Sequence, residues 1–444
     1  MTIKNLSMVL ASVALLGCGG GTTTVVGGSG GSAGQTGGGT GNTGGGSGGS
    51  GGGAANNCPD KDGDGFSICA LDCDDNNANV RPGQTETQNS IDDDCDGKVD
   101  NKISGLDFDK DGTPFPQDCN DDQALIGPQA IEDTTNTIDD NCNGQVDEAA
   151  SDCEGQIAGV NAPDFLRAIG LCSFVSGSSF PVGNVTARNI RAKFGDQWTP
   201  RQGTKMIMLS SGAAKDTNDD AAYNPQPGTE FNTTNTHPLW SAPRCGAPTG
   251  GTAPAAEDMS ELKVTLKVPQ NAKGVSFQFN FFSAEYPEWV CTEYNDRFIA
   301  ILESAALDTS KLPQGSCIPN TNPAQCNVSF DDKGQVVSIN NGFFDVCDSA
   351  SGTSGGQPWT NTCTKPKSQL AKTGYEVADV LGRTTGGATG WLTTKAPVKP
   401  GETITLRFII LDEGDARLDS SVLIDNFKWE FTAVPAPITE PGIN

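Results

Sequence analysis

An acidic segment that is written twice, between residues 58 and 148, constrains the fold of this chain more than any other feature. The first copy reads DKDGDG, LDCDD, a Pro-Gly pair and IDDDCDGKVD, and the second reads DFDKDG, QDCNDD, a Pro-Gln pair and IDDNCNGQVD. The acidic positions of one copy recur 47 residues later in the other, as Asp60 and Asp107 show. Self-similarity at so short a period is typical of a small supersecondary unit in tandem.

The charge of this segment limits how it can fold. It holds 21 Asp and three Glu against five Lys or Arg, a net charge of −19 out of −26 for the whole chain of 444 residues. Like charges at this density repel one another strongly in a compact chain. We therefore expect residues 58–148 to fold around bound cations or to remain disordered. Nucleic acid and anionic lipid headgroups carry the same sign of charge, so the segment excludes them as partners.

Four six-residue stretches of the segment have the form D-x-D-x-D-G or its Asn variant, which suits a hard cation. Side chains one, three and five converge, and Gly at position six permits the sharp turn around the ion. Calcium takes six to eight such oxygens, so we expect several calcium ions and no organic cofactor. The predicted ligands are Asp60, Asp62, Asp64, Asp72, Asp92, Asp94, Asp96, Asp100, Asp107, Asp109, Asp111, Asp118, Asp139, Asn141, Asn143 and Asp147. Further acids are available from outside the loops, namely Asp74, Asp75, Glu86, Asp121, Asp122 and Glu132.

No amphipathic helices flank these loops, which distinguishes them from EF-hands. The loops resemble the calcium-wrapped loops of thrombospondin type 3 repeats. Most closely they resemble the MopE-type metal-binding repeats of secreted bacterial proteins, with DxDGDG, DCDD, PG, E and DDDCDG in that order. The MopE name is associated with copper, but copper sites favour imidazole, thiolate or thioether ligands. Residues 58–148 contain no His and no Met, so the ligand set favours calcium.

The N-terminus carries features of export. Residues 1–18 resemble a bacterial lipoprotein signal peptide, with an apolar stretch too short to span a bilayer and a lipobox-like LLGC run. The resemblance implies that Cys18 is the lipidated mature N-terminus; an ordinary cleaved signal peptide is the alternative. Residues 19–57 are rich in Gly, Ser and Thr and are expected to be a disordered linker. The predicted location is the cell envelope, lipid-anchored at the outer membrane or the cell surface.

The remaining 14 cysteines predict disulfides, because an exported chain meets an oxidising compartment. Equivalent positions in the two acidic copies suggest pairing within each copy. The expected pairs are Cys58–Cys69, Cys73–Cys95 and Cys119–Cys142. The sequence leaves the connectivity within residues 151–434 open.

From residue 151 to 434 the composition becomes that of a globular domain. Apolar and polar residues alternate over 261–268, 273–282, 295–302, 403–411 and 421–431, whereas helical periodicity is confined to a short stretch at 164–169. Many short strands separated by turn residues predict a mainly β fold, a large jelly-roll-like β-sandwich. Several segments, above all FNFFSAEYPEWV and YNDRF, resemble the choice-of-anchor L domain of surface proteins, to which no catalytic activity is assigned.

Two groups of residues in this region are open to more than one interpretation. Carboxylates are concentrated in the segments that resemble the choice-of-anchor L domain. They predict either a second cation site or carboxylates that stabilise turns. Three tryptophans predict either a sugar-stacking platform or buried core residues. The first group is Glu285, Asp296, Asp412, Asp415 and Asp419, and the second is Trp289, Trp359 and Trp391.

The predicted organisation is therefore a signal peptide and lipobox Cys (1–18), a linker (19–57), two metal-binding repeats (58–103 and 104–150), a β-sandwich domain (151–434) and a tail (435–444). The predicted function is that of a non-catalytic calcium-binding surface lipoprotein in adhesion, matrix or envelope interactions. Its partners would be a membrane, through the lipid, and an unidentified extracellular protein or glycan. The alternatives are a secreted carbohydrate-binding module or a carboxylate-based glycoside hydrolase. The chain has one histidine and no H-E-x-x-H motif, which argues against a zinc hydrolase.

We predict that the Cys18→Ala variant is released from the membrane fraction, because this thiol would carry the lipid anchor. Cell fractionation followed by immunodetection measures the change, and Ser29→Ala in the linker serves as the matched control. If Cys18→Ala sediments with membranes to the same extent as the wild type, the lipoprotein interpretation is wrong.

Overall fold

The computed structural model describes residues 58–149, 153–226, 228–239, 255–292, 294–354, 357–376 and 385–442. The predicted signal peptide, Cys18 and the linker lie outside these residues. The described residues belong to one compact unit, Cys58–Asn444. None of its described helices combines the length and the apolar character that crossing a bilayer requires.

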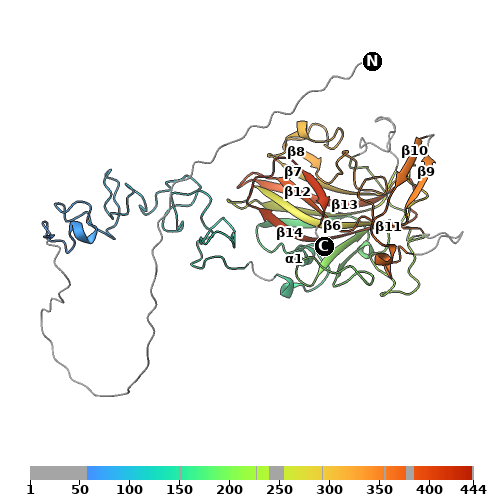
Figure 1. The fold of residues 1–444 in the computed structure, drawn as a ribbon, viewed down its shortest axis with the longest axis horizontal. Coiled ribbons are helices and arrows are strands. Elements are labelled where there is room, and N and C mark those ends of the chain that lie inside the picture. The colour runs from blue at the N-terminus through green and yellow to red at the C-terminus, as the bar shows by residue number, and fades with distance from the viewer. Residues whose placement is uncertain are drawn as a thin grey trace, which may run out of the picture. The chain divides into compact units, whose positions relative to one another are not determined.

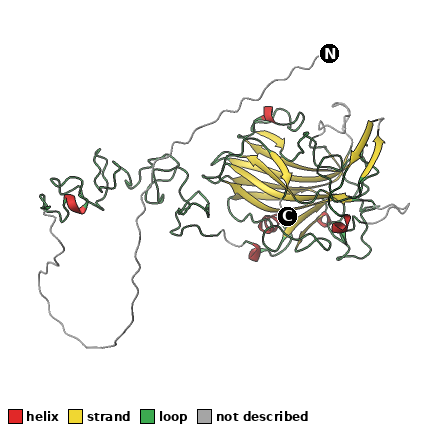
Figure 2. Ribbon diagram, viewed as in Figure 1, coloured by secondary structure: helices red, strands yellow, loops and turns green. Residues whose placement is uncertain are grey.

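The two acidic copies consist almost entirely of turns (Figure 2), with one short 3-10 helix, η1 (Ile68–Ala70). Few apolar side chains are buried there, chiefly Val80 and Ile126. Disulfides join Cys58 to Cys69, Cys73 to Cys95 and Cys119 to Cys142. Because burial of apolar surface is so limited, these covalent links must supply much of the stability of the copies.

The rest of the unit is a sandwich of two antiparallel sheets, as the sequence predicts (Figure 1). Within the described residues, the first sheet has the order β1 (Val175–Val182), β5 (Ala256–Lys267), β13 (Thr403–Glu413), β7 (Arg297–Ser304) and β8 (Ala324–Asn327), with β4 (Thr234–Asn235) also on β5. The second has the order β15 (Ile438–Pro441), β12 (Leu392–Pro397), β6 (Gly274–Ser283), β14 (Ser420–Glu430), β3 (Met206–Ser210) and β2 (Arg188–Arg191), with β11 (Gly387–Ala388) on β6. A separate hairpin is formed by β9 (Ala350–Ser354) and β10 (Gln357–Asn361).

The core lies between the sheets and follows from alternation along the strands, whose side chains point to opposite faces in turn. Phe277 and Phe279 of β6 face the first sheet. Their rings lie 4.9 Å from that of Phe408 on β13 and 4.7 Å from that of Phe298 on β7, respectively. All four side chains are buried to 1% exposure or less. The predicted strand segments coincide with β5, β6, β7, β13 and β14 to within a few residues, apart from the start of β5, which lies further upstream.

Short helices close the ends of the sandwich. The helix α1 (Ala162–Ala168) begins at Asn161, whose side chain accepts a hydrogen bond from the backbone N–H of Asp164 at 3.0 Å. Such a cap satisfies one of the free N–H groups of the first turn. Phe165 and Leu166 of α1 pack into the core between the sheets. The remaining 3-10 helices are η2 (Glu154–Gln156), η3 (Val185–Ala187), η4 (Thr309–Lys311) and η5 (Lys367–Leu370).

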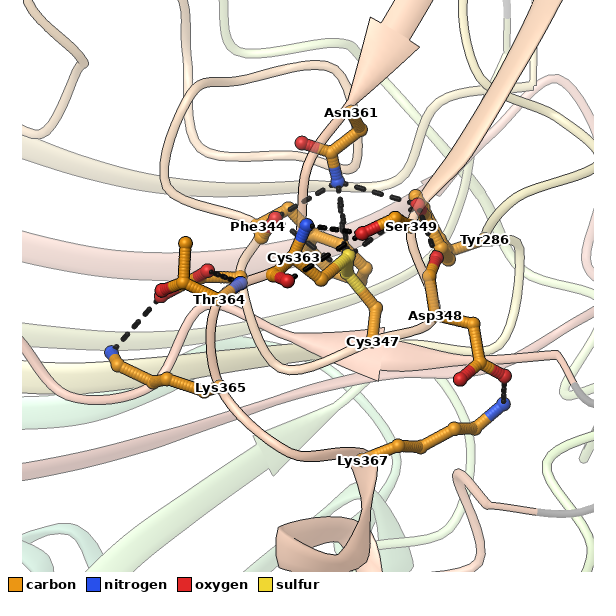
Figure 3. The surroundings of a disulfide bond; sticks show 11 residues. Tyr286, Phe344, Cys347, Asp348, Ser349, Asn361, Cys363, Thr364, Lys365 and Lys367 are labelled. Carbon is orange, nitrogen blue, oxygen red and sulfur yellow. Dashed lines mark hydrogen bonds and ion pairs between the residues drawn. A yellow bond between two sulfur atoms is a disulfide. The ribbon is translucent and has the colours of Figure 1, made fainter.

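A disulfide-linked region follows β7, in the part of the chain where the sequence predicts an insertion or long loops. Disulfides join Cys317 to Cys326 and Cys347 to Cys363. Around the second bond, the Tyr286 hydroxyl donates to the Asp348 carbonyl at 2.8 Å, and the Asn361 amide donates to the Phe344 carbonyl at 2.9 Å (Figure 3). These contacts attach the β9–β10 hairpin to the loop that follows β6.

One buried carboxylate of β14 connects the second sheet to a neighbouring loop. The Asp425 carboxylate is fully buried and accepts hydrogen bonds from the backbone N–H groups of Arg201 at 2.5 Å and Gln202 at 3.1 Å. Burial raises the pKa of Asp425 to about 6, although these N–H donors act in the opposite direction. The folded chain therefore keeps a proton on Asp425 at pH values where the unfolded chain releases it.

Asp425 should make the stability of the protein fall as the pH rises from about 4 to about 6, since only the folded state binds the proton in this window. Asp425→Asn removes this contribution and keeps an oxygen that can accept from the two N–H groups. We expect the Tm of the variant, relative to the wild type, to increase between pH 4 and pH 7 in calorimetric scans. A difference in Tm that stays constant over this range would contradict the raised pKa.

Candidate functional site

The four acidic loops share one pattern of hydrogen bonds, although their sequences differ. We name them loop 1 (60–65), loop 2 (92–97), loop 3 (107–112) and loop 4 (139–144). The first side chain of each accepts from the backbone N–H of the glycine at position six, at 3.0, 2.9, 3.0 and 2.8 Å in loops 1 to 4. The third accepts from the N–H of position five, and the fifth from the N–H of position seven. The three side chains of each loop are thereby held inside one turn.

The glycine at position six is required by backbone conformation rather than by space. Its φ is +100° in Gly65, +93° in Gly97, +102° in Gly112 and +87° in Gly144. A Cβ at any of the four would meet no atom within 4 Å. Residues with a side chain rarely adopt this left-handed region, so glycine is the residue that lets the loop turn back on itself.

Loop 3 gathers the most carboxylates. One oxygen each from Asp107, Asp109 and Asp121 lie within 4.8 Å of one another, and so do oxygens of Asp109, Asp111 and Asp118. Asp118 is 0% exposed and Asp121 is 6% exposed. Asp121, one of the further acids available from outside the loops, repeats Asp75 of the first copy. In loop 1 the oxygens of the three loop carboxylates, at positions 60, 62 and 64, are grouped in the same way.

Many of these oxygens are buried and unsatisfied. The atoms that have no hydrogen-bond partner among the described residues are Oδ2 of Asp62, Asp64 and Asp72 in the first copy, and Asp107 Oδ1, Asp109 Oδ2, Asp118 Oδ2 and Asp121 Oδ2 in the second. A buried oxygen that lacks a partner costs free energy, more so when it is charged. A hard cation would supply the missing partner, so the residues present fit the metal that the repeat pattern implies.

The same crowding shifts the protonation equilibria of loop 3. Burial, followed by the neighbouring carboxylates, raises the pKa of Asp109 to about 6. The pKa values of Asp118 and Asp121 are also raised, again chiefly by burial. Carboxylates in this setting resist ionisation when no counter-charge is present. A bound cation favours the ionised form, so cation binding would release protons.

Loops 2 and 4 are each closed by a glutamate from the preceding turn. The Glu86 carboxylate accepts from the backbone N–H groups of Asp94 at 2.7 Å and Asp100 at 3.0 Å. Glu132 does the same in the second copy, with distances of 3.0 and 3.2 Å. An oxygen of Glu86 also lies within 4.8 Å of oxygens of Asp92 and Asp94. Glu86, one of the further acids available from outside the loops, therefore belongs to the candidate ligands of loop 2.

Asp100 and Asp147, predicted as ligands at the ninth position counted from the start of loops 2 and 4, accept hydrogen bonds from backbone N–H groups. The Asp100 carboxylate accepts from the N–H groups of Asn89 and Ser90 at 2.9 Å, and Asp147 accepts from the N–H of Thr137 at 3.1 Å. Neither belongs to a carboxylate group that could share an ion. Their role in the structure is to close the turn that precedes each loop.

Lys102 places an ammonium group beside loop 2. Its Nζ lies 2.5 Å from Asp96 and 3.2 Å from Asp94. The position 47 residues later is Ala149, so loop 4 lacks this internal cation and carries Asn141 and Asn143 in place of two carboxylates. The negative charge is thus reduced by an ammonium group in loop 2 and by amide side chains in loop 4.

The disulfides exclude cysteine sulfur from the ligands of these sites. Asp118 also lies close to Cys119 and Cys142, but the two sulfur atoms are bonded to each other. They are therefore not thiolate ligands, and the remaining donors are oxygens. Such a donor set suits hard cations rather than copper or zinc.

A second group of carboxylates is buried at one end of the β-sandwich, where β6, β7, β13 and β14 begin or end. Glu285, Asp296 and Asp412 are each 1% exposed, and Asp419 is fully buried. The Glu285 carboxylate accepts from the backbone N–H of Asp296 at 3.0 Å. Asp296 in turn accepts from the Ser420 hydroxyl at 2.6 Å. Of the residues predicted for a second cation site, Asp415 is only half-buried, in the turn after β13.

Burial dominates the electrostatics of this cluster. It raises the pKa values of Glu285, Asp296 and Asp412 well above their usual range, with contributions from their mutual repulsion. Burial also raises the pKa of Asp419 to about 7. Nearby, Glu413 forms a buried ion pair with Arg297 at 2.6 Å. In the described part of the chain, groups of three carboxylates close enough to share an ion lie in the repeats, so a second site here stays a prediction.

Asp419 has a structural role that the sequence did not indicate. One of its oxygens accepts from the backbone N–H of Thr229 at 2.8 Å. A Cβ at Gly212 or Gly228 would collide with its carboxylate. Two separate loops thus approach this side chain with their backbones, and Asp419 joins them to the start of β14.

The three tryptophans have different environments. Trp391 is buried at 3% exposure, whereas Trp289 is 36% exposed and packs edge-on against Tyr294. Trp359 of β10 lies across Gly352 of β9, where a Cβ would collide with its indole. Trp359 lines a groove of about 350 Å³ together with Glu288, Thr292 and the hydroxyl-bearing residues of β9. The tryptophans therefore do not form one continuous platform.

Comparisons with known proteins agree with the two parts of the described structure. The choice-of-anchor L domain model matches residues 167–428, and the copper-binding MopE model, a metal-binding motif, matches residues 72–101 and 118–148. No curated protein matches the chain.

Two solved structures show a weak likeness. TmCBM61, solved in complex with β-1,4-galactotriose, is 9% identical over 59% of this chain and 92% of its own, with a TM-score of 0.21. The K2 cleaved adhesin domain of Lys-gingipain is 8% identical over 57% of this chain and 87% of its own, with a TM-score of 0.22. The family match covers more than half of the sequence, and this chain therefore belongs to the choice-of-anchor L domain family, with two MopE-type metal-binding motifs ahead of that domain.

Proposed function

We propose that this protein is a non-catalytic, surface-anchored calcium-binding lipoprotein that acts in adhesion, matrix or envelope interactions. The observation that carries the proposal is the shared geometry of loops 1 to 4, together with the buried carboxylate oxygens that lack partners in both copies. The donors are oxygens of Asp, Asn and Glu side chains. Calcium is the cation that such flexible, oxygen-rich loops bind most readily.

Calcium would act here through charge and geometry. It supplies the positive charge that the repeats lack, and the protein provides turns that already point their oxygens inward. Loop 3 would use Asp107, Asp109, Asp111, Asp118 and Asp121, and loop 2 would use Glu86 with its own carboxylates. The disulfides hold each copy together whether or not metal is bound, since they act on the unfolded chain.

The burial of the sandwich carboxylates supports a non-catalytic role. A glycosidase needs two carboxyl groups that both reach the scissile bond of a bound sugar. The acids predicted for such a pair are Glu285 and Glu288 with Asp412 or Asp415. Glu285 and Asp412 are each 1% exposed and lie inside the end of the sandwich, whereas Glu288 and Asp415 are half-buried. A substrate could not contact Glu285 or Asp412 unless the surrounding loops opened.

The family and the predicted N-terminus support the location. Choice-of-anchor domains suggest a cell-surface protein. In this proposal Cys18 carries the lipid, residues 19–57 form a tether, and the repeats (58–150) separate the membrane from the domain (151–434). The domain would present its surface to an extracellular protein or glycan.

A second function, saccharide binding, is favoured by the groove beside the β9–β10 hairpin. Trp359 provides an aromatic face, and Ser351, Thr353 and Thr292 provide hydroxyl groups on the same lining. Stacking of a sugar ring on an aromatic side chain, with hydrogen bonds from its neighbours, is a common way to bind glycans.

Removal of calcium should expand the repeats, because it leaves about 19 net negative charges on roughly 90 residues. We expect a chelator to increase the hydrodynamic radius and the protease sensitivity of residues 58–149. Restoring calcium at about one hundred times its Kd would add about 2.7 kcal/mol of stability per ion. Size-exclusion chromatography and mapped limited proteolysis measure these effects.

A variant without calcium binding serves as the comparison for this experiment. It carries Asn in place of the first residue of every loop, Asp60, Asp92, Asp107 and Asp139. This change removes four charges and keeps an oxygen that can accept from the glycine N–H. The variant should no longer respond to calcium, and copper should not replace calcium in the wild type. An unchanged radius and cleavage pattern after chelation of the wild type would show that the repeats fold without metal.

For the saccharide function, Trp359→Ala should abolish binding to any glycan that the wild type retains in an array screen, since it removes the aromatic face. Trp289→Ala is the control, because Trp289 is exposed but does not line the groove. Equal loss of binding in both variants, or binding that survives Trp359→Ala, would exclude the groove as the site.

A further inference from the structure

The turn between β5 and β6 of the sandwich contacts the second metal-binding copy directly. The side chain of Asn271 bonds to both backbone groups of Ile131, accepting from its N–H at 3.2 Å and donating to its carbonyl at 2.7 Å. The backbone N–H of Gln270 donates to the Gln129 carbonyl at 3.1 Å. Asn271 is 7% exposed, so these contacts are shielded from water.

The side chain of Gln270 extends from this turn to loop 3. Its Nε2 donates to the Ala124 carbonyl at 2.9 Å and contacts Oδ2 of Asp111. Its Oε1 is buried and has no hydrogen-bond partner among the described residues. A half-turn of the amide gives up the hydrogen bond from Nε2 to the Ala124 carbonyl and turns Oε1 toward loop 3.

Gly127 marks the space around which these groups converge. A Cβ at this residue would lie 3.1 Å from Asp111 Oδ2, 3.5 Å from Asp118 Oδ2 and 3.6 Å from Gln270 Nε2. Oxygens of Asp109, Asp111 and Asp118 lie within 4.8 Å of one another. Ligands on opposite sides of one calcium ion are about 5 Å apart, since each bond is about 2.3–2.6 Å long.

The unsatisfied oxygens indicate that a ligand belongs at this point. Asp118 is 0% exposed, and its Oδ2 has no partner among the described residues. Asp109 Oδ2 and Gln270 Oε1 are also buried and also have no hydrogen-bond partner among the described residues. The buried, unsatisfied oxygens of Asp109 and Asp118, grouped with the Asp111 carboxylate, form an electrostatically unfavourable arrangement that a divalent cation would make favourable.

We propose that the side-chain oxygen of Gln270 is a ligand of the calcium ion that Asp109, Asp111 and Asp118 hold, so that the choice-of-anchor L domain completes the metal site of the second copy. Calcium bound at loop 3 then fastens this copy to the sandwich, and docking of the copy raises the affinity of the site for calcium. The inference rests on the proposed calcium function and adds a ligand from outside the repeat motif.

The first copy provides an internal comparison. Arg81 occupies the place of Gly127, as the matching bonds from Arg81 N–H to Asp93 carbonyl and from Gly127 N–H to Asp140 carbonyl show. Its guanidinium donates to the backbone carbonyl of Asp64 at 3.1 Å. The hydrogen bonds that the structure describes for loop 1 stay within the first copy. Loop 1 should therefore bind calcium independently of the sandwich.

Calcium titration of the full chain, by calorimetry, tests the proposal. Gln270→Ala should weaken one site roughly tenfold and leave the others unchanged, a loss typical of a removed metal-site partner. Gln270→Glu should keep that site at least as tight as in the wild type, because Glu also presents an oxygen. Gln84→Ala changes a glutamine of the first copy that bonds to Arg81 and serves as the matched control.

A second readout reports on docking. In Gln270→Ala, calcium should no longer protect residues 104–149 from protease to the wild-type extent, whereas protection of residues 58–103 should be retained. The proposal is overturned if Gln270→Ala titrates like the wild type, or if Gln270→Glu loses the same site as Gln270→Ala, which would mean that the amide acts only as a donor to Asp111. If the wild type takes up no calcium at all, the proposed function itself fails, and this outcome is distinct from the other two.

Discussion

Repulsion between closely spaced carboxylates is the constraint on which the N-terminal part of the described structure depends. Nearly every feature of the two copies deals with it. Backbone N–H groups point at the carboxylates of all four loops, Lys102 pairs with loop 2, Lys61 pairs with Asp75, and disulfides hold each copy closed. These devices leave several buried oxygens unsatisfied, because a turn has only a few N–H groups to offer. Counter-ions from solution are the remaining source of charge.

The sandwich deals with buried carboxylates in another way. It has a large apolar core between its sheets, so it can tolerate the cost of burying acids at one end. There Glu285 and Asp296 accept backbone N–H groups, Glu413 pairs with Arg297, and burial favours the protonated state of the others. The same residue type thus serves two purposes in one chain. In the repeats it offers charge to a ligand, and in the domain it ties loops together.

Local patterns account for what could be predicted from the sequence. The D-x-D-x-D-G spacing marks the turns because the turn geometry is contained within six residues, and the alternation of apolar residues marks β6 and β13 because each strand has one face on the core. Contacts between residues that lie apart in the sequence leave no such local pattern. The hydrogen bond from the backbone N–H of Asn89 to the Asp100 carboxylate is one example. Gln270 is 159 residues from Asp111, and a glutamine in a turn carries no mark of an acidic neighbour. The burial of Glu285 and Asp412 was also hidden, since acids near strand ends usually lie in solvent-exposed turns.

The disulfides of the repeats would have a mechanical consequence if the chain is held at one end and bound at the other, as the proposed function requires. A pulling force travels along the shortest covalent path, which crosses each copy through its sulfur atoms. The loops between Cys73 and Cys95 and between Cys119 and Cys142, 22 and 23 residues in sequence separation, therefore cannot be drawn out. Each would otherwise add about 75 Å of extended chain. Under load each disulfide would retain the part of a loop that it encloses: the whole of loop 1, between Cys58 and Cys69, and the first halves of loops 2 and 4, up to Cys95 and Cys142. Loop 3 lies on the stretched path between Cys95 and Cys119 and would open first.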